Sequence, residues 1–397
     1  MICQRAGIIT EAAPIKHRQT QIGHTMRIAF LDSWLQSSAE GSGTAVAIGG
    51  LHRALERRGI RVSRLAPASP RPRGLIARRL IFNAQLPALL RRFSYDLVVG
   101  IDIDGFLWSR LRPYGHPYLA SIKGVLAEEA RQEHGAPYRM LKSLSFLEMA
   151  NARAAQAVLS TSEYCRQAIQ RNYRIAKQQI QIVPEGIDLP RWRQIAHETP
   201  RQSDGQTILC VARQYPRKHV ADLLRAMPLV RQRFPRAKAL IVGDGPEHAA
   251  LLRLAAELNL GDAAQLLGAI PDDDALARMY RRADIFCLPS VQEGFGIVYL
   301  EAMASGLPIV ATKAAAIPEV VPHGQAGLLI QPGNVAELAD SLCNLLGNPE
   351  RRAALGHFGQ EYVARYDWDA VAEQFLDQVQ PFLRPSGIPP LPHPATN

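Results

Sequence analysis

The sequence predicts an α/β protein with two domains, each a doubly wound parallel sheet. Short apolar strands alternate with amphipathic helices along the chain, and this alternation is typical of parallel sheets. The 397 residues are 47% hydrophobic and 21% charged, which is enough apolar material for two cores of ordinary size. A glycine-rich loop at a helix start near Gly296 indicates a ligand site beyond the C-terminal ends of the strands.

The first domain is expected to span residues 27–189. A strand begins at Arg27, a glycine-rich loop occupies residues 40–44, and a helix continues to Arg58. Further strands are expected at 96–101, 118–122, 157–161 and 179–183. Residues 1–26 form a disordered extension in this interpretation, or translation starts at Met26.

The second domain is expected at residues 206–365, after a polar hinge at 190–205. A buried strand at 207–211 leads into a loop that carries Arg213 and Lys218, five residues apart. Residues 240–260 predict a strand, a tight Gly-Asp-Gly-Pro turn and a helix with a mainly architectural role. The Pro-rich end at 384–397 is expected to be a loose tail.

Residues 293–312 contain the motif that is most informative about function. Glycines at 294 and 296 let the backbone approach a ligand, and a helix starting there offers unpaired amides that suit a diphosphate. Glu293 and Glu301 would repel a phosphate, but each can accept hydrogen bonds from vicinal hydroxyls. Phosphate together with paired hydroxyls describes a sugar nucleotide. The alternative is an ordinary helix cap followed by a core strand.

This segment resembles the Glu-x7-Glu motif of the retaining glycosyltransferases of family 4. The resemblance implies a GT-B fold, in which two Rossmann-like domains face each other across a cleft, with a helix at 366–383 that returns to the first domain. It also implies that Glu293 contacts the donor sugar and that Glu301 holds the ribose. The backbone amides that would line the sugar and the diphosphate belong to Phe295, Gly296, Ile297 and Val298.

Two further loops resemble the family's phosphate-binding elements. Arg213 and Lys218 match a loop whose arginine and lysine neutralise the diphosphate, and such cations would stabilise charge on the departing phosphate. The alternative is a pair of solvated surface cations. The loop at 40–44 resembles one that closes over the diphosphate from the other domain, so Gly43 is expected near the phosphate.

The sequence departs from the family pattern at two positions. Lys123-Gly124 stands where a histidine-glycine pair is usual, and Glu185 stands where asparagine is usual. Lys123 could bind the donor sugar, its phosphate or an anionic acceptor, but a lysine is a poor general base unless its pKa is lowered. The expected catalytic set is therefore Glu293, Lys123, Arg213 and Lys218. No metal or other cofactor is expected, because GT-B transferases work without a bound divalent ion.

Residues 53–92 hold eleven arginines and one acid, a charge of +10 that equals the formal net charge of the whole chain. Residues 71–93 mix leucine, isoleucine and phenylalanine with arginines, as in a segment that lies on an anionic membrane or recognises a phosphorylated glycan. A solvated helix face is the alternative, and nucleic acid is not the expected partner. The residues expected to contact an anionic membrane are Arg78, Arg79, Arg91 and Arg92.

The five cysteines are scattered and no apolar run is long enough to span a membrane, which favours a cytoplasmic protein that contacts the inner face of the membrane. The predicted function is a retaining glycosyltransferase that moves a sugar from a nucleotide diphosphate to a hydroxyl of a glycan or lipid-linked acceptor. Cell-envelope polysaccharide or lipopolysaccharide synthesis is the expected setting. The alternatives are a sugar-nucleotide epimerase of the same fold and a non-catalytic, arginine-rich binder of membranes or nucleic acid.

Overall fold

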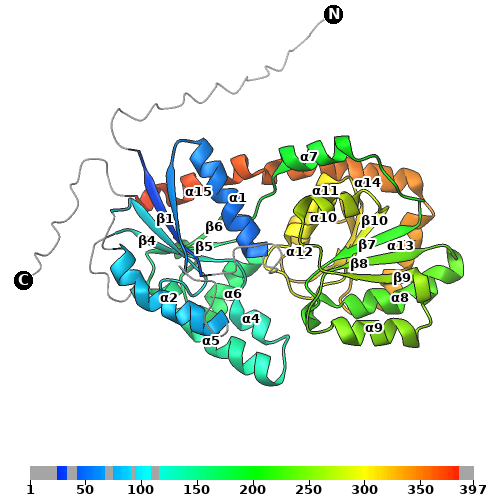
Figure 1. The fold of residues 1–397 in the computed structure, drawn as a ribbon, viewed down its shortest axis with the longest axis horizontal. Helices are drawn as coiled ribbons and strands as arrows, with labels where there is room; N and C mark the ends of the chain where they lie inside the picture. Colours follow the sequence, from blue (N-terminus) through cyan, green and yellow to red (C-terminus); the bar gives the residue numbers. More distant parts are fainter. Residues whose placement is uncertain (1–24, 34–42, 68–74, 91–93, 109–115, 384–397) are drawn as a thin grey trace, which may run out of the picture.

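The computed structural model describes residues 25–33, 43–67, 75–90, 94–108 and 116–383. These residues form two six-stranded sheets in which all paired strands are parallel. Figure 1 shows the two sheets in separate domains that lie side by side, each covered by helices on both faces. The predicted α/β fold with two doubly wound domains is confirmed.

The N-terminal sheet has the strand order β2-β1-β3-β4-β5-β6. Its strands are β1 (Arg27–Leu31), β2 (Arg61–Leu65), β3 (Leu97–Ile101), β4 (Tyr118–Ile122), β5 (Ala157–Ser160) and β6 (Ile180–Ile182). Its helices are α1 (Gly43–Arg57), α2 (Leu75–Leu90), α4 (Leu126–Ala130), α5 (Gly135–Ala154) and α6 (Glu163–Tyr173). The edge strand β2 lies inside the arginine-rich stretch and was not predicted, because only Val62 in it is buried.

The C-terminal sheet has the order β12-β11-β10-β7-β8-β9. Its strands are β7 (Thr207–Val211), β8 (Lys238–Val242), β9 (Ala264–Gly268), β10 (Ile285–Leu288), β11 (Ile309–Thr312) and β12 (Gly327–Ile330). Its helices are α8 (Val220–Arg233), α9 (His248–Glu257), α10 (Asp273–Tyr280), α11 (Ile297–Ala304), α12 (Ile317–Val320), α13 (Val335–Leu346) and α14 (Pro349–Tyr362). The Gly-Asp-Gly-Pro turn contacts the loop after β7, where the backbone amide of Gln214 donates a hydrogen bond to the Asp244 carbonyl.

Two helices join the domains. The segment expected to be a polar hinge contains helix α7 (Leu189–Glu198), which is capped by Asp188 and packs against α10 of the C-terminal domain. Helix α15 (Trp368–Val379) returns to the N-terminal domain and packs against α1, as the resemblance implied (Figure 1). A Cβ on Gly50 of α1 would overlap the ring of Trp368, so this glycine makes room for the returning helix.

Several arginines of the stretch, among the residues that the structure describes, make contacts within the fold. Arg57 binds Asp369 of α15 at 2.7 Å, and the Nε of Arg64 donates to Asp32 at 2.6 Å. Arg78 and Arg79, near the start of α2, are 8% and 2% exposed, so the prediction that they contact a membrane is wrong. The reason is that Arg78 lies on the same helix face as Phe82, Leu86 and Leu90, which are buried against the sheet.

Arg91 and Arg92, which were predicted to share that membrane contact, lie outside the described residues. Among the residues that the structure describes, no helix is both long and apolar enough to cross a membrane.

Candidate functional site

The loop before helix α11 has the backbone geometry expected of an anion site. Gly296 precedes the helix with a φ of 96°, a value that favours glycine, and a Cβ there would lie 2.6 Å from the ring of Tyr299. The next amides, of Ile297 and Val298, begin the helix and have no partner within it. The positive end of the helix dipole and these amides therefore suit a phosphate group.

Glu293 and Lys218 form one ion pair. The Lys218 Nζ lies 2.6 Å from the Glu293 Oε1, and both side chains are largely buried. Lys218 comes from the loop after β7, whereas Glu293 precedes α11, so the fold joins two motifs that the sequence presents separately. Within this pair each charge neutralises the other.

Glu301 lies one helical turn after Ile297, the first residue of α11. Tyr280 donates a hydrogen bond to the Glu301 Oε2 at 2.6 Å. Burial raises the pKa of Glu301 to about 7, and the Tyr280 hydrogen bond opposes that rise. Tyr280 ends α10 and is fully buried against Phe286 and Trp192. Tyr280 was not predicted as a site residue, because nothing in the local pattern of α10 distinguishes it from a core aromatic residue.

The cationic loop after β7 contains a third relevant side chain. Arg213 is exposed, and its guanidinium lies 5.9 Å from the Tyr215 ring centroid. Arg217 lies closer to the same ring, at 4.8 Å, and its Nη2 is 3.7 Å from Glu129 of the N-terminal domain. Arg217 was not predicted as a site residue, although it lies between the two cations that were. Arg217 links the cationic loop after β7 to the N-terminal domain.

Gly43 and Phe295 both lie at the start of helix α11 or in contact with it. Gly43 is the first residue of α1, and a Cβ on it would lie 3.8 Å from Ile297 Cδ1 at the start of α11. The N-termini of helices from the two domains thus face each other. The Phe295 ring packs edge-on against Tyr366 and is 5% exposed, so only the backbone of Phe295 can line a ligand.

The interpretation of Gly294 requires a correction. Its small size was attributed to the approach of a ligand, but a Cβ on Gly294 would lie 2.5 Å from the Lys123 carbonyl oxygen and 3.3 Å from the Gly124 Cα. Gly294 is therefore small because the N-terminal domain packs directly on it. The sequence offered no signal for this, since the contact joins residues of separate domains.

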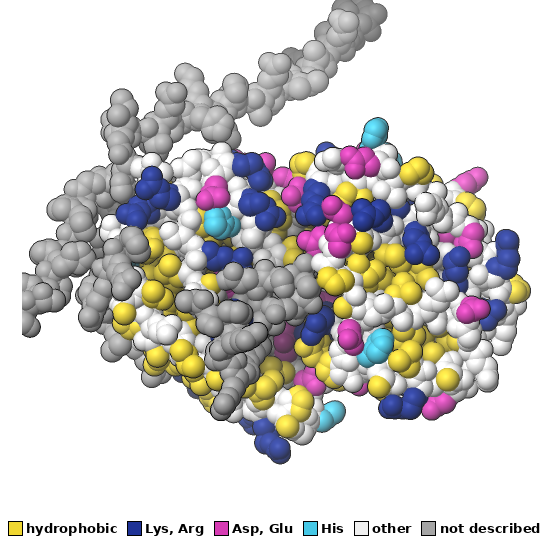
Figure 2. Space-filling model, viewed as in Figure 1, with side chains coloured by type: hydrophobic (Ala, Val, Ile, Leu, Met, Phe, Trp, Pro, Cys, Tyr) yellow, Lys and Arg dark blue, Asp and Glu magenta, His cyan; other side chains and the backbone are white. Residues whose placement is uncertain are grey.

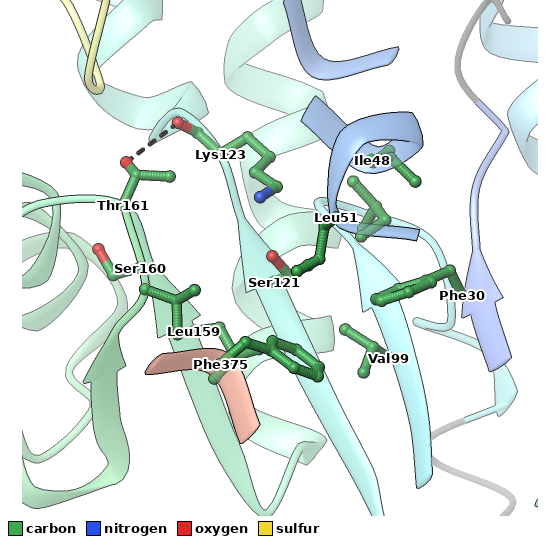
Figure 3. A pocket seen from close by; sticks show the side chains of 12 residues that line it. Phe30, Ile48, Leu51, Val99, Ser121, Lys123, Leu159, Ser160, Thr161 and Phe375 are labelled. Carbon is green, nitrogen blue, oxygen red and sulfur yellow. Dashed lines mark hydrogen bonds between the residues drawn. The ribbon is translucent and has the colours of Figure 1, made fainter. Parts of the chain in front are cut away.

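The two departures from the family pattern are one buried ion pair. Lys123 Nζ lies 2.9 Å from Glu185 Oε1, and the two side chains are 12% and 6% exposed. The Lys123 backbone amide donates to Asp102 Oδ1 at 3.0 Å, which fixes the start of this loop. Figure 3 shows the Lys123 side chain pointing into a pocket of the N-terminal domain, beside Ser121 and Leu51.

Two family models match consecutive parts of the chain. The model described as Glycosyltransferase Family 4 matches residues 41–191, and the model described as Glycosyl transferases group 1 matches residues 193–362. Together they cover most of the chain and meet at helix α7, between the two sheets.

Curated relatives are matched over part of their length. A GDP-mannose-dependent alpha-(1-6)-phosphatidylinositol monomannoside mannosyltransferase of Mycobacterium tuberculosis is 32% identical over 52% of this chain and 56% of the relative. A D-inositol 3-phosphate glycosyltransferase of Nocardia farcinica is 33% identical over 65% of this chain and 58% of the relative. The chain thus spans little more than half the length of these relatives.

Solved structures share the fold. Sucrose-phosphate synthase of Thermosynechococcus elongatus superposes with a TM-score of 0.74 and 23% identity, over 90% of this chain and 98% of that one. HepE of Anabaena in complex with UDP-glucose superposes with a TM-score of 0.67 and 21% identity, over 90% of this chain and 100% of that one.

Proposed function

The chain belongs to glycosyltransferase family 4 and has the GT-B fold, and on that premise we propose that it transfers a sugar from a nucleotide diphosphate to an acceptor hydroxyl with retention of configuration. The observation that carries the proposal is the convergence of Glu293, Lys218 and Glu301 at the N-terminus of α11. A site for a sugar nucleotide needs carboxylates that accept hydrogen bonds from hydroxyls, cations that bind phosphates, and unpaired helix amides.

The proposed roles follow from the chemistry of each group. Glu301 accepts hydrogen bonds from the ribose hydroxyls, and Glu293 contacts the donor sugar. When the donor binds, its diphosphate competes with Glu293 for Lys218, which leaves the glutamate available to the sugar hydroxyls. Lys218 and Arg213 then stabilise the charge that develops on the phosphate oxygen as the glycosidic bond breaks.

No protein side chain is required as a strong base in this proposal. The acceptor hydroxyl attacks on the face from which the diphosphate departs, and a phosphate oxygen of the leaving group takes its proton. The acceptor oxygen forms the new bond to the anomeric carbon while the bond to the phosphate oxygen breaks, so the products are the glycoside and the protonated nucleoside diphosphate. The proposal includes no metal ion and no other cofactor.

The relatives support a hexose donor and an acceptor that is phosphorylated or linked to lipid. One relative is named for GDP-mannose and a phosphatidylinositol monomannoside, and another for inositol 3-phosphate. We propose an acceptor of the same class, a glycan or glycolipid of the cell envelope, with the N-terminal domain as its binding domain. The nucleobase and the sugar of the donor are the first properties to determine.

We also propose that the protein works in the cytoplasm at a membrane surface, because large apolar side chains are exposed on the N-terminal domain. Leu80 and Ile81 of α2 are 41% and 49% exposed, and Phe146 of α5 is 57% exposed. Figure 2 shows hydrophobic side chains gathered over the part of the N-terminal domain where Figure 1 draws α2 and α5. Exposed apolar side chains of this size are typical of surfaces that enter the lipid headgroup region.

The experiment that tests the donor site is a thermal-shift panel with GDP-mannose, UDP-glucose, UDP-N-acetylglucosamine and ADP-glucose. A donor that binds raises the melting temperature in proportion to the logarithm of its concentration over its dissociation constant. Release of nucleoside diphosphate in the presence of lipid-linked or phosphorylated acceptors then measures transfer, and NMR of the product gives the anomeric configuration. Glu301→Ala is expected to abolish the shift, whereas Glu293→Ala is expected to reduce turnover chiefly.

The alternatives give different results in the same experiment. An epimerised donor without transfer would establish an epimerase, and no shift with any sugar nucleotide would favour a non-catalytic binder. For the membrane, co-sedimentation with liposomes containing phosphatidylglycerol compares the native chain with Ile81→Ser/Phe146→Ser. A matched control replaces the exposed Leu252 of the C-terminal domain by serine. Equal binding by all three proteins would reject the membrane surface.

A further inference from the structure

The domains touch at the residue that follows Glu293. The Gly294 carbonyl accepts hydrogen bonds from Thr161 Oγ1 and Ser162 Oγ, both at 2.9 Å, and these side chains lie between β5 and α6 of the N-terminal domain. On its other side Gly294 packs against the Lys123-Gly124 backbone, as described above. The backbone beside Glu293 is thus held by the opposite domain.

A second contact lies at the start of α6. Glu319, on the short helix α12 of the C-terminal domain, accepts hydrogen bonds from the backbone amides of Glu163 and Tyr164, each at 2.7 Å. These are the first two amides of α6 and have no partner within the helix. A carboxylate at a helix N-terminus also interacts favourably with the helix dipole, so Glu319 supplies both hydrogen bonds and charge.

The two contacts are connected through the backbone of the C-terminal domain. The Ala316 amide, at the residue preceding α12, donates to the Glu293 carbonyl at 3.3 Å. Glu319 is three residues further along that turn. The α6 N-terminus therefore holds the Glu293–Gly294 backbone by two routes, directly through Thr161 and Ser162 and indirectly through Glu319 and Ala316.

We propose that Glu319 is a positioning residue that docks the C-terminal domain on α6 and thereby fixes Glu293 opposite the acceptor domain. Opening of the cleft would break the Glu319 and Gly294 hydrogen bonds together and release the backbone that carries Glu293. In this arrangement, closure of the two domains also aligns Glu293 with the donor sugar. The inference rests on the proposed function in one respect, that Glu293 contacts the donor sugar.

The test compares Glu319→Gln with Glu350→Gln, an exposed glutamate on α14 that serves as the matched control. Transfer kinetics are measured with GDP-mannose or UDP-glucose, whichever stabilises the chain in the donor panel. Glu319→Gln is expected to lower kcat tenfold to a hundredfold, because a displacement of about 1 Å at a reacting group has effects of that size. The dissociation constant of the donor is expected to stay within about twofold, since no donor ligand changes.

Domain closure is measured independently by small-angle X-ray scattering of the ligand-free protein. Glu319→Gln and Gly294→Ala are expected to increase the radius of gyration, and Glu350→Gln is expected to leave it unchanged. An unchanged kcat and radius in Glu319→Gln would overturn the proposal. A parallel loss of kcat, donor affinity and melting temperature would also overturn it, because that pattern indicates a structural role. If the native chain transfers no sugar, the proposed function fails, while the scattering comparison still decides whether Glu319 holds the domains closed.

Discussion

Raising the pH from 6 to 8 is expected to strengthen donor binding about tenfold, because Glu301 must be ionised to accept hydrogen bonds from both ribose hydroxyls. Burial raises the pKa of Glu301 to about 7. A carboxyl with that pKa is roughly one-tenth ionised one pH unit below it and roughly nine-tenths ionised one unit above it. Since the donor binds the ionised form, its dissociation constant falls as the pH rises through 7.

The measurement is isothermal titration calorimetry with the nucleotide sugar that the thermal-shift panel selects. The diphosphate of such a donor is esterified at both ends, so its own charge stays constant over this range. Glu301→Gln is expected to bind weakly and without a pH dependence. Tyr280→Phe removes the hydrogen bond that lowers the pKa of Glu301, so the midpoint of the affinity change should move to higher pH.

Glu293→Gln provides the matched control, because it changes the other carboxylate of the site and should keep the slope between pH 6 and 8. Affinity that is independent of pH in the native protein would refute this reasoning. A slope retained in Glu301→Gln would refute it equally, since the titrating group would then lie elsewhere.

Two further predictions concern contacts that hold the N-terminal domain. Lys123→Met is expected to lower the free energy of unfolding by about 3–5 kcal/mol, because it leaves the Glu185 carboxylate buried without its partner. Lys123→Met/Glu185→Leu should recover most of that loss in urea denaturation, and equal instability of the single and double variants would contradict the coupling. Trp368→Ala is expected to cost about 3–5 kcal/mol in calorimetry, whereas Phe146→Ala, at an exposed position, should cost less than about 0.5 kcal/mol. Similar losses in both would contradict the packing assigned to Trp368.

The fold could be predicted because most strands are apolar runs bounded by glycine or polar turns. Strand β2 escaped prediction for a physical reason, since an edge strand buries little and its Arg64 is neutralised by Asp32, which lies elsewhere in the sequence. Helix α7 escaped because its polar composition is also that of a linker. Asp188 before Pro190 was a capping signal that could have revealed it.

The candidate donor site could be proposed from the sequence because its carboxylates and amides belong to one continuous segment, residues 293–301. The contacts made across the domains could not, because Gly294 packs on Lys123 and Glu319 binds α6 only after both domains have folded. The burial of Arg78 could have been predicted. It precedes Phe82 by four residues, which places both side chains on one helix face.

The returning helix α15 has a consequence for the synthesis of the protein. One face of the N-terminal sheet is covered partly by Val371, Phe375 and Val379, which pack with Ile28 and Phe30. These residues are translated about 340 positions after the first strand. The domain that leaves the ribosome first therefore keeps part of an apolar face uncovered until residues 368–379 have been translated, after the strands of the second domain. A truncation before Trp368 would leave this apolar face permanently open to aggregation.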